Sequence, residues 1–317
     1  MPGSSSASAQ TPDMHEAAEL IAIGNDHLSV TISPYGAELM SLRDRIGREW
    51  LWQGNPAIWN RRAPILFPFI GRCANNELRH QGKIYPAPNG HGFGPRSIYQ
   101  VMERTPSSAR LRLAPDDDKR RQFPFDLQLD VDFTLVDGVL HQTATVINVD
   151  DGPAVASVGF HPGFAWPSPA APAVASTAYV VDFMVDESSS VHRIVGGYLS
   201  GATAANPVME RRLALDPELF RNDAIVFKDV ASRSVWFGVP GHTGVRVGFD
   251  CPTLALWMRP GGRYLCIEPW QGHHCPEGFA GDVMDKPGMV ALAPGGSFSR
   301  TMSIEIDVQE AQLRPPD

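Results

Sequence analysis

Alternation of apolar and polar side chains is the feature of this chain that most restricts its possible folds. From Phe125 to Leu135 every second residue is apolar and the residues between are polar. Successive side chains of a strand point to opposite faces, so this pattern predicts a half-buried strand. Asp137-Gly138 predicts a tight turn, and Val139–Val149 predicts the returning antiparallel strand. In a third segment, near the C-terminus, one face is predicted to carry Phe298, Met302, Ile304 and Ile306, and the other Ser299, Thr301, Ser303 and Glu305.

Turn-forming residues punctuate the whole chain, which has 29 glycines and 28 prolines among its 317 residues. Only Asp116–Gln122 and Pro217–Phe220 favour short helices. Many strands without long helices between them predict an all-β fold, a large antiparallel two-sheet β-sandwich. We expect a single domain over residues 19–310, a disordered N-terminal tail over 1–18 and a C-terminal tail over 311–317.

Charge and composition exclude several classes of function. The formal net charge of −8 disfavours nucleic acid as a partner. No apolar run approaches the ~20 residues of a membrane span, and the N-terminal residues lack the pattern of a signal peptide. Four cysteines in so long a chain do not predict a disulfide framework, so we expect a cytoplasmic protein.

Motifs for cofactors are missing from the sequence. It contains no phosphate loop and no nucleophile elbow, and Gly90–Gly94 lacks the third glycine of a dinucleotide site. His273-His274-Cys275 fits no common zinc spacing, so we interpret it as a loop with two exposed imidazoles. We therefore expect neither a cofactor nor a metal.

Four polar residues follow apolar segments rich in glycine, proline or aromatic residues: Arg72, His91, His161 and Glu268. Each has a structural alternative. Arg72 and Glu268 could form ion pairs, His91 could belong to a simple turn, and His161 could be a hydrogen-bonded core residue. The functional interpretation is a sugar site, because aromatic faces beside polar groups suit a ring with C–H patches and hydroxyls. A carboxylate buried like Glu268 would have a raised pKa and act as a better base.

These segments resemble the aldose 1-epimerase family, in particular its LacX-like and hexose-6-phosphate-epimerase-like branch. The resemblance covers residues from about 20 to 308, and the similar motifs follow the family's order. They are Gly71-Arg72-x-Ala74-Asn75, Gly159-Phe160-His161-Pro162, Phe220-x-x-Asp223-Ala224-Ile225-Val226-Phe227 and Cys266-Ile267-Glu268-Pro269-Trp270-x-Gly272.

The resemblance implies a galactose mutarotase-like sandwich that binds a small-molecule sugar, needs no cofactor and acts as a monomer or homodimer. It implies that Glu268 is the general base and His161 the general acid of an anomer interconversion. Further residues that it implies for substrate binding are Arg72, His91, Asp223, Asn75, Trp270 and Arg96.

The sequence departs from the family's pattern at one motif, which bears on whether the substrate carries a phosphate. Relatives that act on phosphorylated hexoses carry His-Gly-x-Ala-Arg, whereas here the arginine of His91-Gly92-Phe93-Gly94-Pro95-Arg96 comes one residue later. On a strand that shift reverses the side chain, so we expect a neutral aldose to be processed at least as well as its 6-phosphate. Arginines elsewhere could still converge at the cleft: Arg43, Arg61, Arg62, Arg96 and Arg259. A hexose-6-phosphate epimerase, a non-catalytic sugar binder, and a glycosidase using Asp223 with Glu268 remain alternatives.

Overall fold

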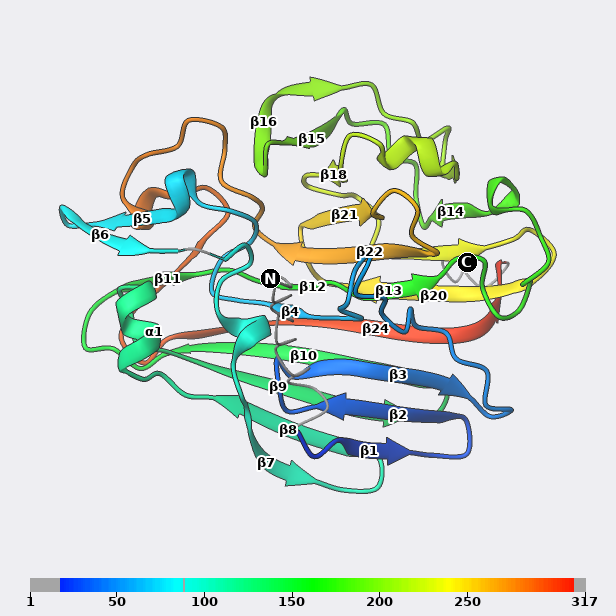
Figure 1. Ribbon diagram of the computed structural model, residues 1–317, viewed down its shortest axis with the longest axis horizontal. Helices are drawn as coiled ribbons and strands as arrows, with labels where there is room; N and C mark the ends of the chain where they lie inside the picture. The colour runs from blue at the N-terminus through cyan, green and yellow to red at the C-terminus, as the bar shows by residue number, and fades with distance from the viewer. Residues whose placement is uncertain (1–17, 88, 311–317) are drawn as a thin grey trace, which may run out of the picture.

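The computed structural model describes residues 18–87 and 89–310, and within them nearly every regular element is a strand (Figure 1). The expected tails, 1–18 and 311–317, lie outside these residues except for Ala18. The prediction of an all-β antiparallel fold is confirmed. No helix in the described ranges is long and apolar enough to cross a membrane.

Two large antiparallel sheets dominate the described residues. The nine-stranded sheet has the order β17 (Arg212–Ala214), β14 (Val180–Phe183), β19 (Ser234–Gly238), β20 (Thr243–Phe249), β24 (Ser297–Gln309), β10 (Val139–Asn148), β9 (Leu127–Val136), β8 (Ser108–Leu113) and β7 (Gln100–Arg104). The eight-stranded sheet has the order β16 (Tyr198–Ala204), β15 (Val191–Val195), β18 (Ile225–Phe227), β21 (Thr253–Trp257), β22 (Tyr264–Gln271), β12 (Val158–Phe160) and β4 (Ile65–Leu66), with β13 (Gly163–Ala165) also paired to β22.

Smaller elements complete the described fold. The strands are β1 (Ile21–Gly24), β2 (Leu28–Ser33) and β3 (Glu38–Asp44) in one sheet, the β5 (Glu77–His80)–β6 (Lys83–Pro86) hairpin, and β11 (Ala154–Ala156) paired with β23 (Val290–Leu292). The helix is α1 (Asp117–Gln122), and the 3-10 turns are η1 (Ala74–Asn76), η2 (Gly94–Arg96), η3 (Ser176–Ala178), η4 (Pro217–Phe220) and η5 (Val283–Asp285).

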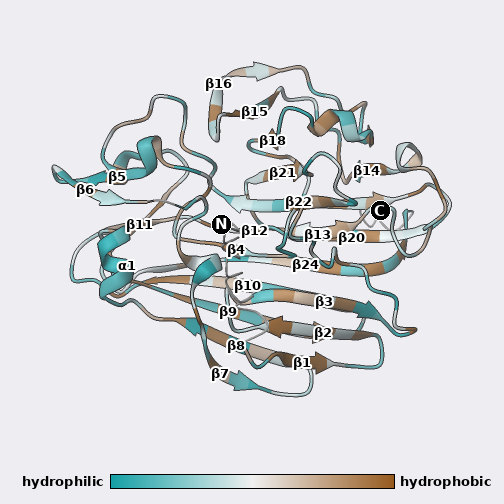
Figure 2. Cartoon of the chain, in the orientation of Figure 1, coloured by the Kyte–Doolittle hydropathy of each residue, from teal (hydrophilic) through white to brown (hydrophobic). Residues whose placement is uncertain are grey.

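The alternating segments form the elements predicted for them. In the β9–β10 hairpin Val136 pairs with Val139, and Asp137 takes the left-handed conformation of the turn with φ of 51°. Both predicted helical turns are present, and Asp116 caps α1 by accepting the backbone N–H of Lys119. Figure 2 shows that α1 and the β5–β6 hairpin are hydrophilic, whereas brown segments recur along the strands of the sheets.

One contiguous apolar core includes side chains from both large sheets, among them Ile267 of β22, Val247 of β20 and Ile304 of β24. Strand β22 is buried along most of its length. A strand that is buried on both faces can hold polar side chains in a low dielectric, where their pKa values shift. Strand β22 holds Glu268 and Trp270 of the candidate site in such an environment.

Candidate active site

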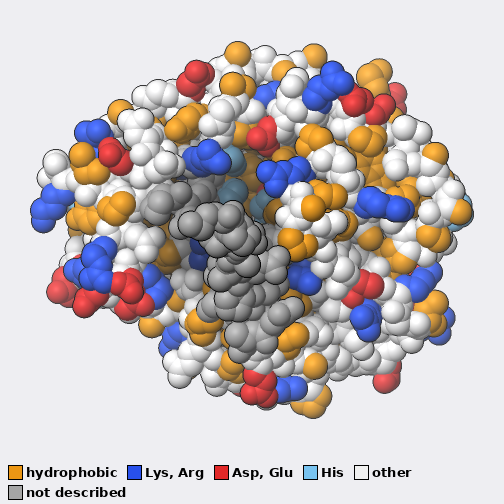
Figure 3. Space-filling model, in the orientation of Figure 1, with side chains coloured by type: hydrophobic (Ala, Val, Ile, Leu, Met, Phe, Trp, Pro, Cys, Tyr) orange, Lys and Arg blue, Asp and Glu red, His pale blue; other side chains and the backbone are white. Residues whose placement is uncertain are grey.

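A cleft of about 740 Å³ opens against the eight-stranded sheet, with residues of β4, β21 and β22 in its wall. In Figure 3 a hollow with histidines in its floor lies between groups of Lys or Arg side chains. The cleft brings together most of the residues predicted for the site: Arg72, His91, Arg96, His161, Asp223, Glu268 and Trp270.

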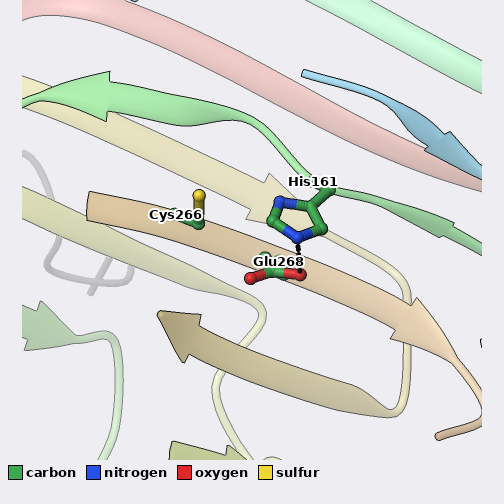
Figure 4. A group of neighbouring side chains, drawn as sticks. All are labelled: His161, Cys266 and Glu268. Atoms are coloured by element: carbon green, nitrogen blue, oxygen red, sulfur yellow. Dashed lines mark ion pairs between the residues drawn. The ribbon is translucent and has the colours of Figure 1, made fainter. Parts of the chain in front are cut away.

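His161 faces Glu268 because of the strand register. On one side of His161, Gly159 of β12 pairs with Trp270, and on the other side Gly163 of β13 pairs with Cys266. Counting inward from both pairs places position 161 opposite position 268. The Nε2 atom of His161 accordingly lies 3.1 Å from Oε2 of Glu268 (Figure 4).

Burial disfavours the charged form of both groups. It raises the pKa of Glu268 well above its usual value, helped by the negative charge of Asp223. It lowers the pKa of His161 to about 3. The Glu268 Oε2 atom makes no hydrogen bond within the described residues, because its contact with His161 is not aligned for one. Burial therefore shifts the two pKa values in opposite directions, and each shift favours the neutral form of its group.

Cys266 shares this face of β22 with Glu268, two residues away (Figure 4). One nitrogen of His161, the sulfur of Cys266 and one oxygen of Glu268 lie within 4.8 Å of one another, a spacing that a metal ion could bridge. Burial beside Glu268 raises the pKa of the Cys266 thiol well above its usual value. A metal ion binds the deprotonated forms of Cys266 and Glu268, which their raised pKa values disfavour. These residues therefore fit a metal ion poorly.

His91 is held in one tautomer by the backbone. Its Nδ1 atom accepts the N–H of Gly71 at 3.2 Å, so its proton lies on Nε2, the other ring nitrogen. Burial lowers its pKa well below the usual value, and the ring is neutral. Gly92 follows with φ of 67°, and a Cβ there would lie 2.3 Å from the carbonyl oxygen of Phe67. Only glycine allows this close approach.

Asp223 lies at the cleft wall just before β18, in a left-handed conformation with φ of 71° that is uncommon outside glycine. Its Oδ1 accepts the backbone N–H of Ala224 at 2.8 Å. Burial raises its pKa, and the positive charge of Arg72 opposes that shift. Asp223 therefore adds a carboxyl group to the cleft wall, near the positive charge of Arg72.

Four arginines reach the cleft: Arg61, Arg72, Arg96 and Arg259. The charge of Arg61 is balanced by the buried Glu38, 2.7 Å away. Arg96 donates to the carbonyls of Gly90 and Gly92, both at 3.1 Å. In the described part of the chain no carboxylate lies within 4 Å of Arg72, Arg96 or Arg259. The cleft is therefore locally positive although the chain is acidic.

Two interpretations of the sequence need correction here. Arg96 lies in the 3-10 turn η2 and not on a strand, so the one-residue shift does not turn it away from the cleft. His273 and His274 are not exposed: His273 is 5% exposed, and the ring of His274 lies in the cleft wall with its Nδ1 donating to the carbonyl of Gly197. Burial lowers the pKa of each imidazole to about 4.

Sequence reasoning missed two aromatic side chains of the cleft. Trp59 stacks on His161 with ring centroids 5.1 Å apart, and Trp257 packs edge-on to the same imidazole. Trp257 ends a strand that the sequence predicted, whereas nothing in the pattern around Trp59 marks it. Asn75 is not among the residues that line the cleft. It lies in η1 with φ of 54° and borders a separate small cavity.

The architecture is that of the galactose mutarotase-like fold. A galactose mutarotase related enzyme from Lactobacillus acidophilus superposes with a TM-score of 0.85 at 28% identity, covering 92% of this chain and 98% of that one. A galactose mutarotase-like protein from Lactobacillus casei gives 0.84 at 26% identity, covering 91% and 100%.

The chain belongs to the aldose 1-epimerase family, whose model matches residues 19–181. A curated relative, the protein LacX of Lactococcus lactis subsp. lactis, is 28% identical over 297 residues, which cover 90% of this chain and 99% of that protein. Family and fold together support an epimerase or mutarotase kind of function on sugars.

Proposed function

We propose that this protein interconverts the α and β anomers of a hexose or related aldose, with Glu268 as the general base and His161 as the general acid. The observation that carries the proposal is the 3.1 Å contact between these two groups in the floor of the cleft. The anomeric hydroxyl and the ring oxygen of an aldose are bonded to the same carbon. An acid and a base that act on them must therefore lie within the width of one sugar ring.

The reaction follows from the two roles. The Glu268 carboxylate removes the proton of the anomeric hydroxyl while His161 protonates the ring oxygen, and the bond between the anomeric carbon and the ring oxygen breaks. The resulting aldehyde rotates about its bond to the next carbon. Ring closure on the other face reverses both proton transfers and leaves the inverted anomer with the enzyme unchanged.

The opposite pKa shifts of the two groups support these roles. Transfer of a proton from a neutral Glu268 carboxyl group to His161 makes a carboxylate base and an imidazolium acid at once, without a proton from solvent. His91, which presents an Nε2–H, and Arg72 are the donors proposed to hold substrate oxygens, with Asp223 as an acceptor. Trp270 and the exposed guanidinium of Arg96 complete the proposed binding set.

A hexose 6-phosphate is a second candidate substrate, favoured by the arginines. Arg72, Arg96 and Arg259 line the cleft without a carboxylate within 4 Å in the described residues. Arginine binds phosphate through paired, charge-assisted hydrogen bonds, so two or three such side chains suit a dianion. This local charge counters the overall acidity that led us to expect a neutral sugar.

The test follows pure α-anomers of glucose, galactose and their 6-phosphates by NMR or polarimetry, above the spontaneous rate. Glu268→Gln is expected to lower the rate by ~10²–10⁴-fold, because an amide keeps the size of the neutral carboxyl and cannot accept the proton. Glu277→Gln makes the same chemical change at an exposed position and is expected to leave the rate unchanged.

If the Glu268→Gln variant keeps more than about a tenth of the wild-type rate, Glu268 is not the base. If the wild-type protein binds the sugars without accelerating anomer exchange, it is a sugar-binding protein and the proposal is wrong.

A further inference from the structure

The imidazole of His161 lacks the hydrogen bond that usually orients a proton-transferring histidine. Its Nε2 atom faces Glu268, whereas its Nδ1 atom is buried and makes no hydrogen bond with another described residue. Such a histidine is commonly held by a hydrogen bond on the nitrogen that does not react. Another contact must therefore fix this ring. That contact must also suit a positive charge, because the acid role needs the imidazolium form.

An indole ring is stacked on this imidazole. The ring centroids of Trp59 and His161 are 5.1 Å apart, and the angle between the two planes is 29°. Trp257 packs against the same imidazole at 86°, with centroids 5.6 Å apart. The two indoles also contact each other, and both line the cleft. The proposed acid is therefore held by aromatic rings in place of a hydrogen bond.

Gly163, two residues after His161, leaves room for this stack. A Cβ at Gly163 would lie 2.8 Å from the Cζ3 atom of Trp59. A larger residue would therefore push the indole away from the imidazole, and glycine permits the contact. The backbone of Gly163 also holds the neighbouring segment. Its N–H donates to the carbonyl of Arg62 at 2.8 Å, and its carbonyl accepts the N–H of Trp52 at 2.9 Å.

The segment that carries Trp59 is anchored from two sides. The Nε1 atom of Trp52 donates to the carbonyl oxygen of Trp59 at 2.9 Å. Just after Trp59 in the chain, the backbone N–H groups of Arg62 and Ala63 donate to Oε1 of Glu38, at 2.6 and 3.1 Å. The Glu38 side chain is fully buried, so this anchor is shielded from water. The protein's own contacts therefore hold the indole over the imidazole.

We propose that Trp59 is a positioning residue that orients the imidazole of His161 and stabilises its protonated form. This inference rests on the proposed function, in which His161 is the acid. The face of an indole carries negative potential and attracts a cation that lies over it, more strongly than the face of phenylalanine or tyrosine does. The attraction grows where water is excluded, and His161 is only 8% exposed. Trp59 therefore offsets part of the cost of charging a buried imidazole.

The expected effect of this contact is on kcat. The indole first meets an uncharged imidazole, and the attraction strengthens only as a proton moves onto His161. An interaction that is stronger in the transition state than in the ground state raises kcat, whereas one that is equal in both states changes KM. Loss of the indole face is therefore expected to lower kcat by about 10- to 30-fold and to leave KM within about twofold.

Three changes at position 59 separate the charge effect from packing, with anomer exchange followed by NMR over a range of sugar concentrations. Trp59→Leu removes the aromatic face and is expected to give the full loss in kcat. Trp59→Phe keeps a weaker face and is expected to retain roughly a third of the wild-type kcat or more. Tetrafluorotryptophan at position 59 alone keeps the shape of the indole without its negative face, and is expected to lower kcat about as much as Trp59→Leu. This last change tests the proposal even if Trp59→Leu folds poorly.

A double-mutant cycle with His161→Asn shows whether Trp59 acts through the imidazole. Without the imidazole there is no cation to stabilise, so Trp59→Leu is expected to cost less than about twofold in that background, measured at protein concentrations that keep exchange above the spontaneous rate. A purely structural role of the indole would slow both backgrounds equally. The matched control Trp236→Leu removes a buried indole from β19, in the other large sheet, and is expected to leave kcat within about twofold.

Several results would overturn the proposal. They are a wild-type kcat in Trp59→Leu or in the fluorinated protein, equal losses in Trp59→Leu and Trp59→Phe, and equal losses with and without His161. A rise in KM with kcat unchanged would also overturn it, because the indole would then act on the sugar alone. If the wild-type protein does not accelerate anomer exchange, the proposed function fails. If it does and Trp59→Leu is unaffected, only the role of Trp59 fails.

Discussion

Lowering the pH from 7 to 5 is expected to destabilise the folded protein by about 4 kcal/mol through two buried histidines, His273 and His274. Burial is the main cause that lowers the pKa of each imidazole from 6.5 to about 4. The unfolded chain therefore binds protons below pH 6.5 that the folded chain excludes until about pH 4. Stability that is fully present above pH 6.5 is lost as the pH falls through this window.

The size of the effect follows from linkage. Each histidine loses about 1.4 kcal/mol per pH unit inside its window, which is about 2 kcal/mol between pH 7 and pH 5. The shifts of His161 and Glu268 act in opposite directions, because burial lowers the pKa of one and raises the pKa of the other. The lowered pKa of His91 adds a loss of the same sign as the losses from His273 and His274. A loss of 4 kcal/mol is a large part of the 5–15 kcal/mol that stabilises a typical domain.

Urea unfolding at pH 7 and pH 5, followed by circular dichroism, gives the two free energies of unfolding. His273→Asn keeps a donor near the position of the ring Nδ1, which contacts the carbonyl of His274 at 2.7 Å, and removes one titrating group. The loss between the two pH values is expected to shrink by about 2 kcal/mol in this variant. His27→Asn removes an imidazole that is exposed to solvent and is expected to leave the loss unchanged. A loss in His273→Asn within about 0.5 kcal/mol of the wild-type loss would refute the reasoning.

Three further predictions concern activity. His161→Asn is expected to lower the rate of anomer exchange by ~10²–10⁴-fold without loss of sugar binding, and a small drop in rate with a large rise in KM would contradict the acid role. The rate is expected to be level between pH 7 and pH 6, because burial favours the neutral forms of both His161 and Glu268, and to fall at alkaline pH as the Glu268 carboxyl group loses its proton; a fall between pH 7 and pH 6 would contradict these shifts. Arg96→Ala is expected to weaken kcat/KM for a hexose 6-phosphate by about 10-fold and to spare the neutral sugar, and equal losses for both would remove the arginine from phosphate recognition.

Local pattern was enough to predict much of the fold. The alternation over residues 125–135 and 139–149 predicted β9 and β10, and Asp137-Gly138 predicted their turn. A strand's faces and a short turn depend on neighbouring residues alone, so their signal is complete in the sequence. The resemblance to a family then supplied residues of the cleft that periodicity could not.

The cleft required contacts between distant segments. Trp59 comes from a loop whose local sequence carries no signal for a site, and only the folded chain stacks it on His161. Arg259 was named from the sequence only as an arginine that could converge at the cleft, and the folded chain places it in the cleft wall. Arg96 was misjudged because its direction depends on η2, a turn set by tertiary packing, and not on strand alternation.

The sequence by itself determined the all-β class, the turns and the identity of the polar residues available for chemistry, because these depend on composition and short-range periodicity. Tertiary structure decided which of these residues meet and which are charged. The register of β22 placed Glu268 against His161. Electrostatic energies depend on burial and on distances between segments, and neither is written in the local sequence.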